Sequence, residues 1–133
     1  MFKRLTGVVL LAAAGLAAGP ALAQAQQGKP MMKAPTGTPR TITGTVIDVS
    51  CKFGQGLTGA EHQMCAGVCA DKGIPLAILT DDGKLFLAIS PAMPGEPQNA
   101  RLKEFAETRV TVTGKVFNAG GASAIEIDRI TKG

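Results

Sequence analysis

A strict alternation of apolar and polar residues near the end of the chain constrains the fold most strongly. Between residues 109 and 117, valine and glycine alternate with threonine and lysine, and an alternating segment resumes over residues 122–130 after a glycine-containing turn. Successive side chains of a strand point to opposite faces of a sheet, so this pattern predicts strands with one buried face. The two segments therefore predict a β-hairpin packed against a core.

Three further strands and two helical segments are predicted before this hairpin. The strands are expected over residues 40–49, 76–80 and 85–90. Asp81-Asp82-Gly83-Lys84 joins the last two, because an Asp-Gly pair accepts the positive φ of a tight turn. Residues 99–106 predict two helical turns, which place Leu102, Phe105 and Ala106 on one face.

The other helix is expected between the first two strands. Gly54-Gln55-Gly56 predicts a loop, and Thr58-Gly59-Ala60-Glu61 matches the capping box that begins a helix. We expect this helix over residues 59–72, ended by Gly73 and Pro75. It forms the main part of an insertion at about residues 51–73.

Five short strands with a helix between the third and fourth follow the element order of the OB-fold. We therefore predict a mainly β domain over residues 40–133, built as a five-stranded OB-fold-like Greek-key barrel. A helical insertion follows the first strand, and a short helix lies between strands three and four. The loop after the first strand is one of the usual ligand-binding loops of this fold.

Two motifs add a family resemblance. Residues 44–51 have the pattern G-x-V-x-D-x-x-C, and residues 62–69 have the pattern H-x-x-C-A-x-x-C. Together with the closing hairpin, they resemble small exported bacterial OB-fold-like proteins of uncharacterised function. The resemblance spans residues 41–130 and implies the barrel fold and export, but no activity.

The insertion also gathers all three cysteines and the one histidine of the chain. On a helix that advances about 100° per residue, His62, Cys65 and Cys69 form one stripe. Cys51, expected at the end of the first strand, can close over that stripe. The set Cys51, His62, Cys65 and Cys69 matches a tetrahedral zinc site, and its thiolates equally suit Cu(I).

A disulfide is the alternative use of these cysteines. Cys65 and Cys69 are poorly oriented to bond each other, so Cys51 would pair with one of them and leave an odd thiol. The protein would then be a disulfide-stapled, non-catalytic binding or adaptor module. Redox chemistry is a third possibility, because a thiol beside His62 or near the start of a helix would have a lowered pKa.

The sequence disfavours other functional classes. It lacks a nucleophile elbow, a phosphate-binding loop and a dinucleotide fingerprint, so no catalytic residue is assigned. Nucleic-acid binding by an OB-fold requires stacking aromatic residues on a basic face, and the chain has no Tyr or Trp. The partner expected for the alternative module is an unidentified protein or small molecule.

The first 23 residues have the pattern of a secretory signal peptide. Lys3 and Arg4 precede an apolar stretch of about 14 residues, which is short for a membrane span, and Ala21-Leu22-Ala23 fits a cleavage site. We expect a periplasmic or secreted protein with no stable membrane anchor after processing. Residues 24–39, rich in Pro and Gly, predict a disordered arm.

The mature chain should begin at Gln24. Signal peptidases accept small residues at the two positions that Ala21 and Ala23 occupy. Amino-terminal sequencing of the protein from a periplasmic extract checks this. Recovery of chains that begin with Met1 from a membrane fraction would contradict it.

Overall fold

The computed structural model describes residues 34–133, so the predicted signal peptide and most of the predicted arm lie outside the described residues. No helix of this part of the chain is long and apolar enough to cross a membrane. The elements, in chain order, are β1 (Thr38–Asp48), α1 (Val49–Gln55), the 3-10 turn η1 (Ala60–His62), α2 (Gln63–Asp71), β2 (Leu76–Thr80), β3 (Leu85–Ile89), α3 (Asn99–Leu102), the 3-10 turn η2 (Lys103–Phe105), β4 (Arg109–Ala119) and β5 (Ala122–Lys132).

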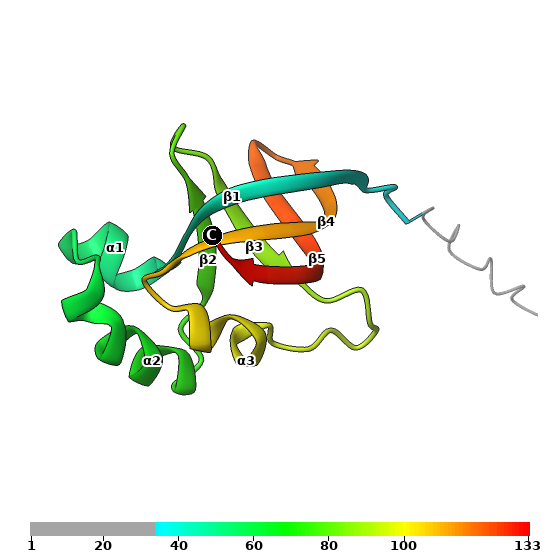
Figure 1. Cartoon of the computed structure of the whole chain (residues 1–133). Helices are drawn as coiled ribbons and strands as arrows, with labels where there is room; N and C mark the ends of the chain where they lie inside the picture. The colour runs from blue at the N-terminus through cyan, green and yellow to red at the C-terminus, as the bar shows by residue number, and fades with distance from the viewer. Residues whose placement is uncertain (1–33) are drawn as a thin grey trace, which may run out of the picture. The chain divides into compact units, whose positions relative to one another are not determined.

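The five strands close into a barrel in the order β1-β2-β3-β5-β4. β1 pairs with both β2 and β4, and β3 pairs with β5 in the parallel direction. Figure 1 shows the strands crossing in this barrel, with α1 and α2 together beside the end of β1. The predicted mainly β, five-stranded OB-fold-like barrel is confirmed, with a helix after strand one and another between strands three and four.

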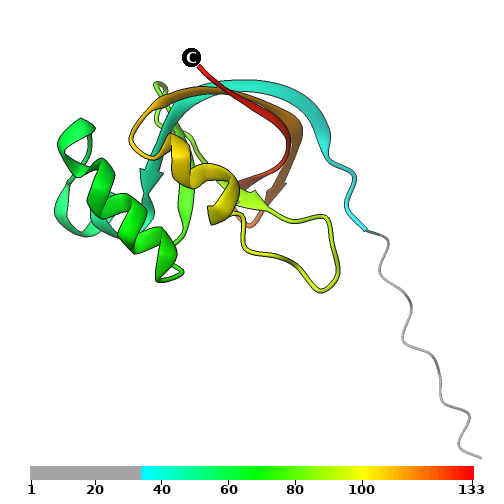
Figure 2. The same ribbon diagram turned by 60° about the horizontal axis from the view of Figure 1, so that its bottom comes forward.

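The predicted alternation fills the barrel interior. In β4, Val110, Val112, Gly114 and Val116 are buried, whereas Lys115 between them is exposed. Leu102 and Phe105, from α3 and η2, belong to the same core cluster, so this helical segment covers the core from one side (Figure 2). The remaining members of the cluster come from the other strands and from α2: Val46, Ala70, Leu76, Ile78, Phe86, Ile125 and Ile127.

The insertion differs from the prediction in its helices. A helix, α1, occupies residues 49–55, and it ends at Gly56 with φ at 71°, so the loop begins later than Gly54-Gln55-Gly56 predicted. Asp48 caps this helix, since its Oδ1 accepts a hydrogen bond from the Cys51 amide at 3.0 Å. Cys51 therefore lies in the first turn of α1 and not at the end of the first strand. The predicted helix over residues 59–72 is instead η1 followed by the shorter α2.

The capping box predicted at Thr58 and Glu61 does not form. The Thr58 hydroxyl and the Gly59 amide both donate to Oε2 of Glu107, at 3.0 and 2.8 Å. Glu61 is exposed. The local pattern is wrong here because a buried carboxylate 48 residues beyond Gly59 supplies a better acceptor.

Both ends of the insertion are fixed to the barrel. β1 runs directly into α1, and Asn99 at the start of α3 holds the other end. The Asn99 side-chain amide donates to the carbonyls of Ala70 and Ile74 at 2.9 and 2.8 Å, and its Oδ1 accepts from the Leu76 amide at 3.1 Å. The cysteines of the insertion are therefore carried on helices with defined positions. β1 itself begins at Thr38, two residues earlier than predicted.

Gly114→Ala should destabilise the barrel. A Cβ at this position would lie 2.1 Å from the Glu126 carbonyl oxygen, next to a register shift between β4 and β5. We expect the free energy of unfolding to fall by about 1–3 kcal/mol, the usual cost of overpacking. Urea denaturation measures this. Gly54→Ala is the control, because its Cβ meets nothing within 4 Å; an equal loss in both variants would contradict the explanation.

Candidate metal centre

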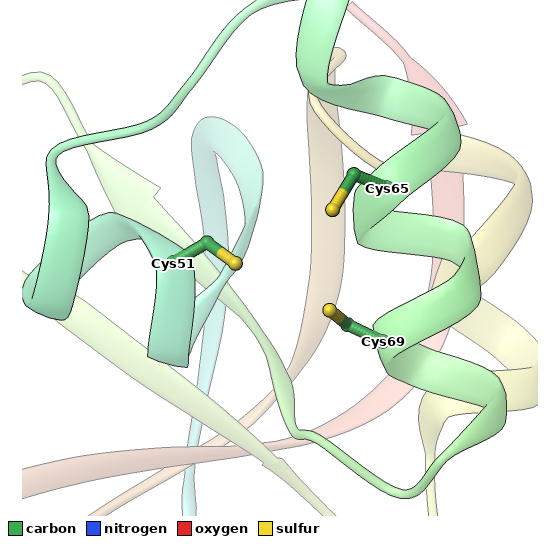
Figure 3. A group of neighbouring side chains, drawn as sticks. All are labelled: Cys51, Cys65 and Cys69. Atoms are coloured by element: carbon green, nitrogen blue, oxygen red, sulfur yellow. The ribbon is translucent and has the colours of Figure 1, made fainter.

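Three cysteine side chains meet between α1 and α2. Cys51 projects from α1 toward Cys65 and Cys69, which lie one turn apart on the facing side of α2 (Figure 3). The three Sγ atoms all lie within 4.8 Å of one another, and all three cysteines are free thiols. Cys51 is buried, Cys69 is half-buried and Cys65 is exposed, so the cluster is open to solvent on the Cys65 side.

Local sequence explains this convergence. The spacing of four residues places Cys65 and Cys69 on the same face of α2. Asp48 starts α1 as its cap, and this puts Cys51 in the first turn of the helix. The three cysteines that were predicted as ligands therefore lie together in the structure.

His62 belongs to a second group of three, which shares Cys51 with the first. One ligand atom each of Asp48, Cys51 and His62 lies within 4.8 Å of the other two, and all three residues are buried. The four predicted ligands thus form two groups that share Cys51. The prediction instead placed His62, Cys65 and Cys69 in one helical stripe with Cys51 over it. The difference arises because His62 lies in the tighter η1 turn before α2.

Glu107 fixes the orientation of His62. Its Oε1 lies 3.0 Å from His62 Nδ1, and the Glu107 side chain is fully buried. Because this carboxylate also accepts hydrogen bonds at Oε2, we assign the ring hydrogen to Nδ1, which leaves a lone pair on Nε2. Among the described residues, the buried Nε2 has no hydrogen-bond partner. A carboxylate bonded to the far nitrogen of a histidine in this way is typical of metal-bound histidines.

The backbone of Glu107 is itself constrained. Its φ is 59°, the one positive φ among the described residues other than glycine. Its amide donates to the Val46 carbonyl of β1 at 2.7 Å. A conformation of this kind costs about 1–3 kcal/mol and is found where the surrounding structure fixes it, often at functional sites.

Asp48 carries a second unsatisfied atom. Its Oδ2 is buried and has no hydrogen-bond partner within residues 34–133, and none of the ion pairs there includes Asp48. Burial opposes ionisation, but hydrogen bonds led by that from the Cys51 amide hold the pKa of Asp48 below its usual value. A buried carboxylate that interacts with two thiols and forms no ion pair among the described residues makes this position suitable for a cation.

The thiols next to this carboxylate retain their protons. Burial, followed by interaction with Asp48, raises the pKa of the Cys51 thiol. Interaction with Asp48, followed by burial, raises the pKa of Cys69 to about 12. The lowered thiol pKa that the redox interpretation requires is therefore wrong for both residues. A metal ion would have to displace these protons.

Sequence analysis did not identify Asp48 and Glu107 as site residues. Asp48 had a usable signal, because an aspartate three residues before a cysteine can both cap a helix and lie near that cysteine. Glu107 had none, because it lies 45 residues from His62 and reaches it only through the closure of the barrel.

No protein-family model matches the chain, and no significant match is found among curated proteins or solved structures. The resemblance to small exported OB-fold-like proteins therefore stays a prediction. The function has to be argued from the residues of the site.

Glu107→Ala should destabilise the insertion and leave the barrel folded. The substitution keeps the positive φ but leaves the buried donor of His62 and the half-buried donor of Gly59 without an acceptor, which costs about 1–3 kcal/mol. Hydrogen exchange should rise over residues 59–71 and stay slow around Val112. Glu104→Ala, at an exposed position of the neighbouring turn, is the control. Uniform loss of protection would mean that Glu107 stabilises the whole domain.

Proposed function

We propose that this protein is an exported small domain that binds a soft or borderline metal ion, zinc or copper, through Cys51, Cys65, Cys69 and His62. One observation carries the proposal. Three thiols from two helices converge, and one of them, that of Cys51, also lies near the buried His62, whose Nε2 has no hydrogen-bond partner in the described part of the chain.

The donor atoms suit these metals. Zinc binds cysteine sulfur and histidine nitrogen in tetrahedral sites, and thiolates are the preferred ligands of Cu(I). Access is provided at Cys65, which is exposed, while Cys51 is buried at the inner side of the cluster. An ion can therefore enter from solvent without opening the barrel.

Metal binding would also stabilise the insertion. Cys51 lies on α1, whereas Cys65 and Cys69 lie on α2, and the loop between the helices is exposed. An ion bound by all three residues would cross-link the two helices. An ion that binds the folded state and not the unfolded state raises the free energy of unfolding, because the ion must dissociate before the domain unfolds.

Export is supported by the sequence of residues 1–23, which has the pattern of a secretory signal peptide. The resemblance of the two cysteine motifs and the closing hairpin to small exported proteins agrees with it. We therefore propose a periplasmic or secreted location.

The alternative is a disulfide-stapled binding or adaptor module. The closeness of the three sulfurs favours it as well, since Cys51 faces both cysteines of α2 (Figure 3). A disulfide would use two thiols, but it would leave His62 Nε2 and Asp48 Oδ2 buried without partners. A metal ion bound by the cysteines and His62 accounts for the sulfurs and for the buried Nε2, and we therefore prefer it.

The reduced protein should bind zinc and Cu(I) in separate oxygen-free titrations. Cys51→Ser should weaken binding by more than about 100-fold, since the loss of even an outer partner of a metal ligand costs about 10–100-fold. His62→Ala should also weaken it. Met64→Leu is the matched control, because it removes an exposed thioether next to Cys65. If the reduced wild type binds neither metal, the proposal fails and the disulfide becomes the explanation of the cysteines.

Binding should weaken as the pH falls. The raised pKa values of Cys51 and Cys69 mean that both thiols are protonated before binding at neutral pH. Each proton that the metal displaces makes the apparent affinity fall by about tenfold per pH unit. Competition with a chelator of known affinity at several pH values measures the slope. An affinity that does not change with pH would show that no thiolate binds the ion.

A further inference from the structure

The site offers more ligands than one tetrahedral ion can use. Cys51, Cys65 and Cys69 form one group, and Asp48, Cys51 and His62 form the other. A tetrahedral ion takes four ligands, and five side chains are present. Asp48 and His62 both belong to the second group, and each has a buried atom, Oδ2 and Nε2, without a hydrogen-bond partner among residues 34–133.

We propose that the site holds two divalent metal ions bridged by the Cys51 thiolate. An outer ion is bound by Cys51, Cys65 and Cys69, and an inner ion is bound by Asp48, Cys51 and His62. This inference rests on the proposed function and extends it. The single-ion proposal gives Asp48 no role, and here Asp48 binds a second ion together with His62 and the shared Cys51.

Charge favours two ions over one. Three thiolates and the Asp48 carboxylate carry four negative charges, and the buried Glu107 carboxylate beside His62 adds a fifth. No lysine or arginine forms an ion pair with these residues in the described part of the chain. One divalent ion would leave three negative charges in a largely buried cluster, which is costly in a low dielectric. Two divalent ions balance the four charges of the ligands and leave only that of Glu107, which accepts hydrogen bonds from Thr58 and Gly59.

The geometry permits a shared ligand. In each group the ligand atoms lie within 4.8 Å of one another, and Cys51 is common to both. Ions in two-metal sites are about 3.5–4 Å apart, a separation that one bridging atom can span. Cys51 is the buried member of the cysteine cluster, and it also lies beside the capping carboxylate of Asp48.

Burial distinguishes the two ions. Asp48 is 0% exposed and His62 is 7% exposed, whereas Cys65 of the outer group is exposed. A chelator can therefore reach the outer ion first. The inner ion should dissociate more slowly, because its release requires movement of α1 or η1 away from β1.

Native mass spectrometry of the reduced, zinc-loaded protein tests the proposal. We expect two zinc ions in the wild type and two in the Glu61→Gln control, which changes an exposed residue next to His62. Asp48→Asn and His62→Gln should each retain one. Asp48→Asn keeps an oxygen that can cap α1, so the helix should still form. Cys65→Ser should also lower the count to one, and Cys51→Ser should remove both ions.

Each other outcome is informative. A wild type with one zinc overturns the two-ion proposal but leaves the proposed function standing, and a wild type with none overturns both. Two ions in both Asp48→Asn and His62→Gln would mean that the second ion binds elsewhere, which also overturns it. Cadmium NMR supplies a readout without variants: two resonances coupled through the shared sulfur are expected, and uncoupled resonances would contradict the bridge.

Discussion

The carboxylate of Glu107 is the interaction on which the candidate site depends. It accepts hydrogen bonds from the Thr58 hydroxyl, the Gly59 amide and the His62 ring. These bonds connect η1 and the residues just before it to the chain that leads into β4. The Glu107 amide is bonded to Val46 of β1. One buried residue thus connects the insertion to two strands, and its orientation determines which nitrogen of His62 is free.

The barrel supplies the rigidity that this arrangement needs. β4 pairs with residues 38–45 of β1 and β2 pairs with residues 44–48, so the strand is paired along its length and its end is fixed by β2. Asp48 is the last residue of this strand and also the cap of α1. The chain therefore changes from strand to helix at Asp48, and this places the Asp48 carboxylate next to Cys51.

The fold could be predicted from sequence where the signals are local. Alternation identified the strands, and Asp81-Asp82-Gly83-Lys84 identified the turn between β2 and β3, where Gly83 has φ at 81°. The cysteine cluster was also predicted, because helical spacing places Cys65 and Cys69 on one face. The errors lie at the start of the insertion. The capping box was wrong because Glu107 is brought to Thr58 by the closure of the barrel, which no local pattern encodes.

The burial of Asp48 and His62 bears on the two proposed uses of the cysteines. A buried polar group without a partner costs about 1–3 kcal/mol, and this site has two such atoms among the described residues. A disulfide contributes typically about 2–4 kcal/mol, but it leaves both atoms unsatisfied. Structural zinc contributes about 10–16 kcal/mol in small peptides, and the two ions proposed above would bind through Asp48 and His62. The burial of a carboxylate and an imidazole near three thiols therefore supports the proposed cation site over the disulfide, with the cysteines as its ligands.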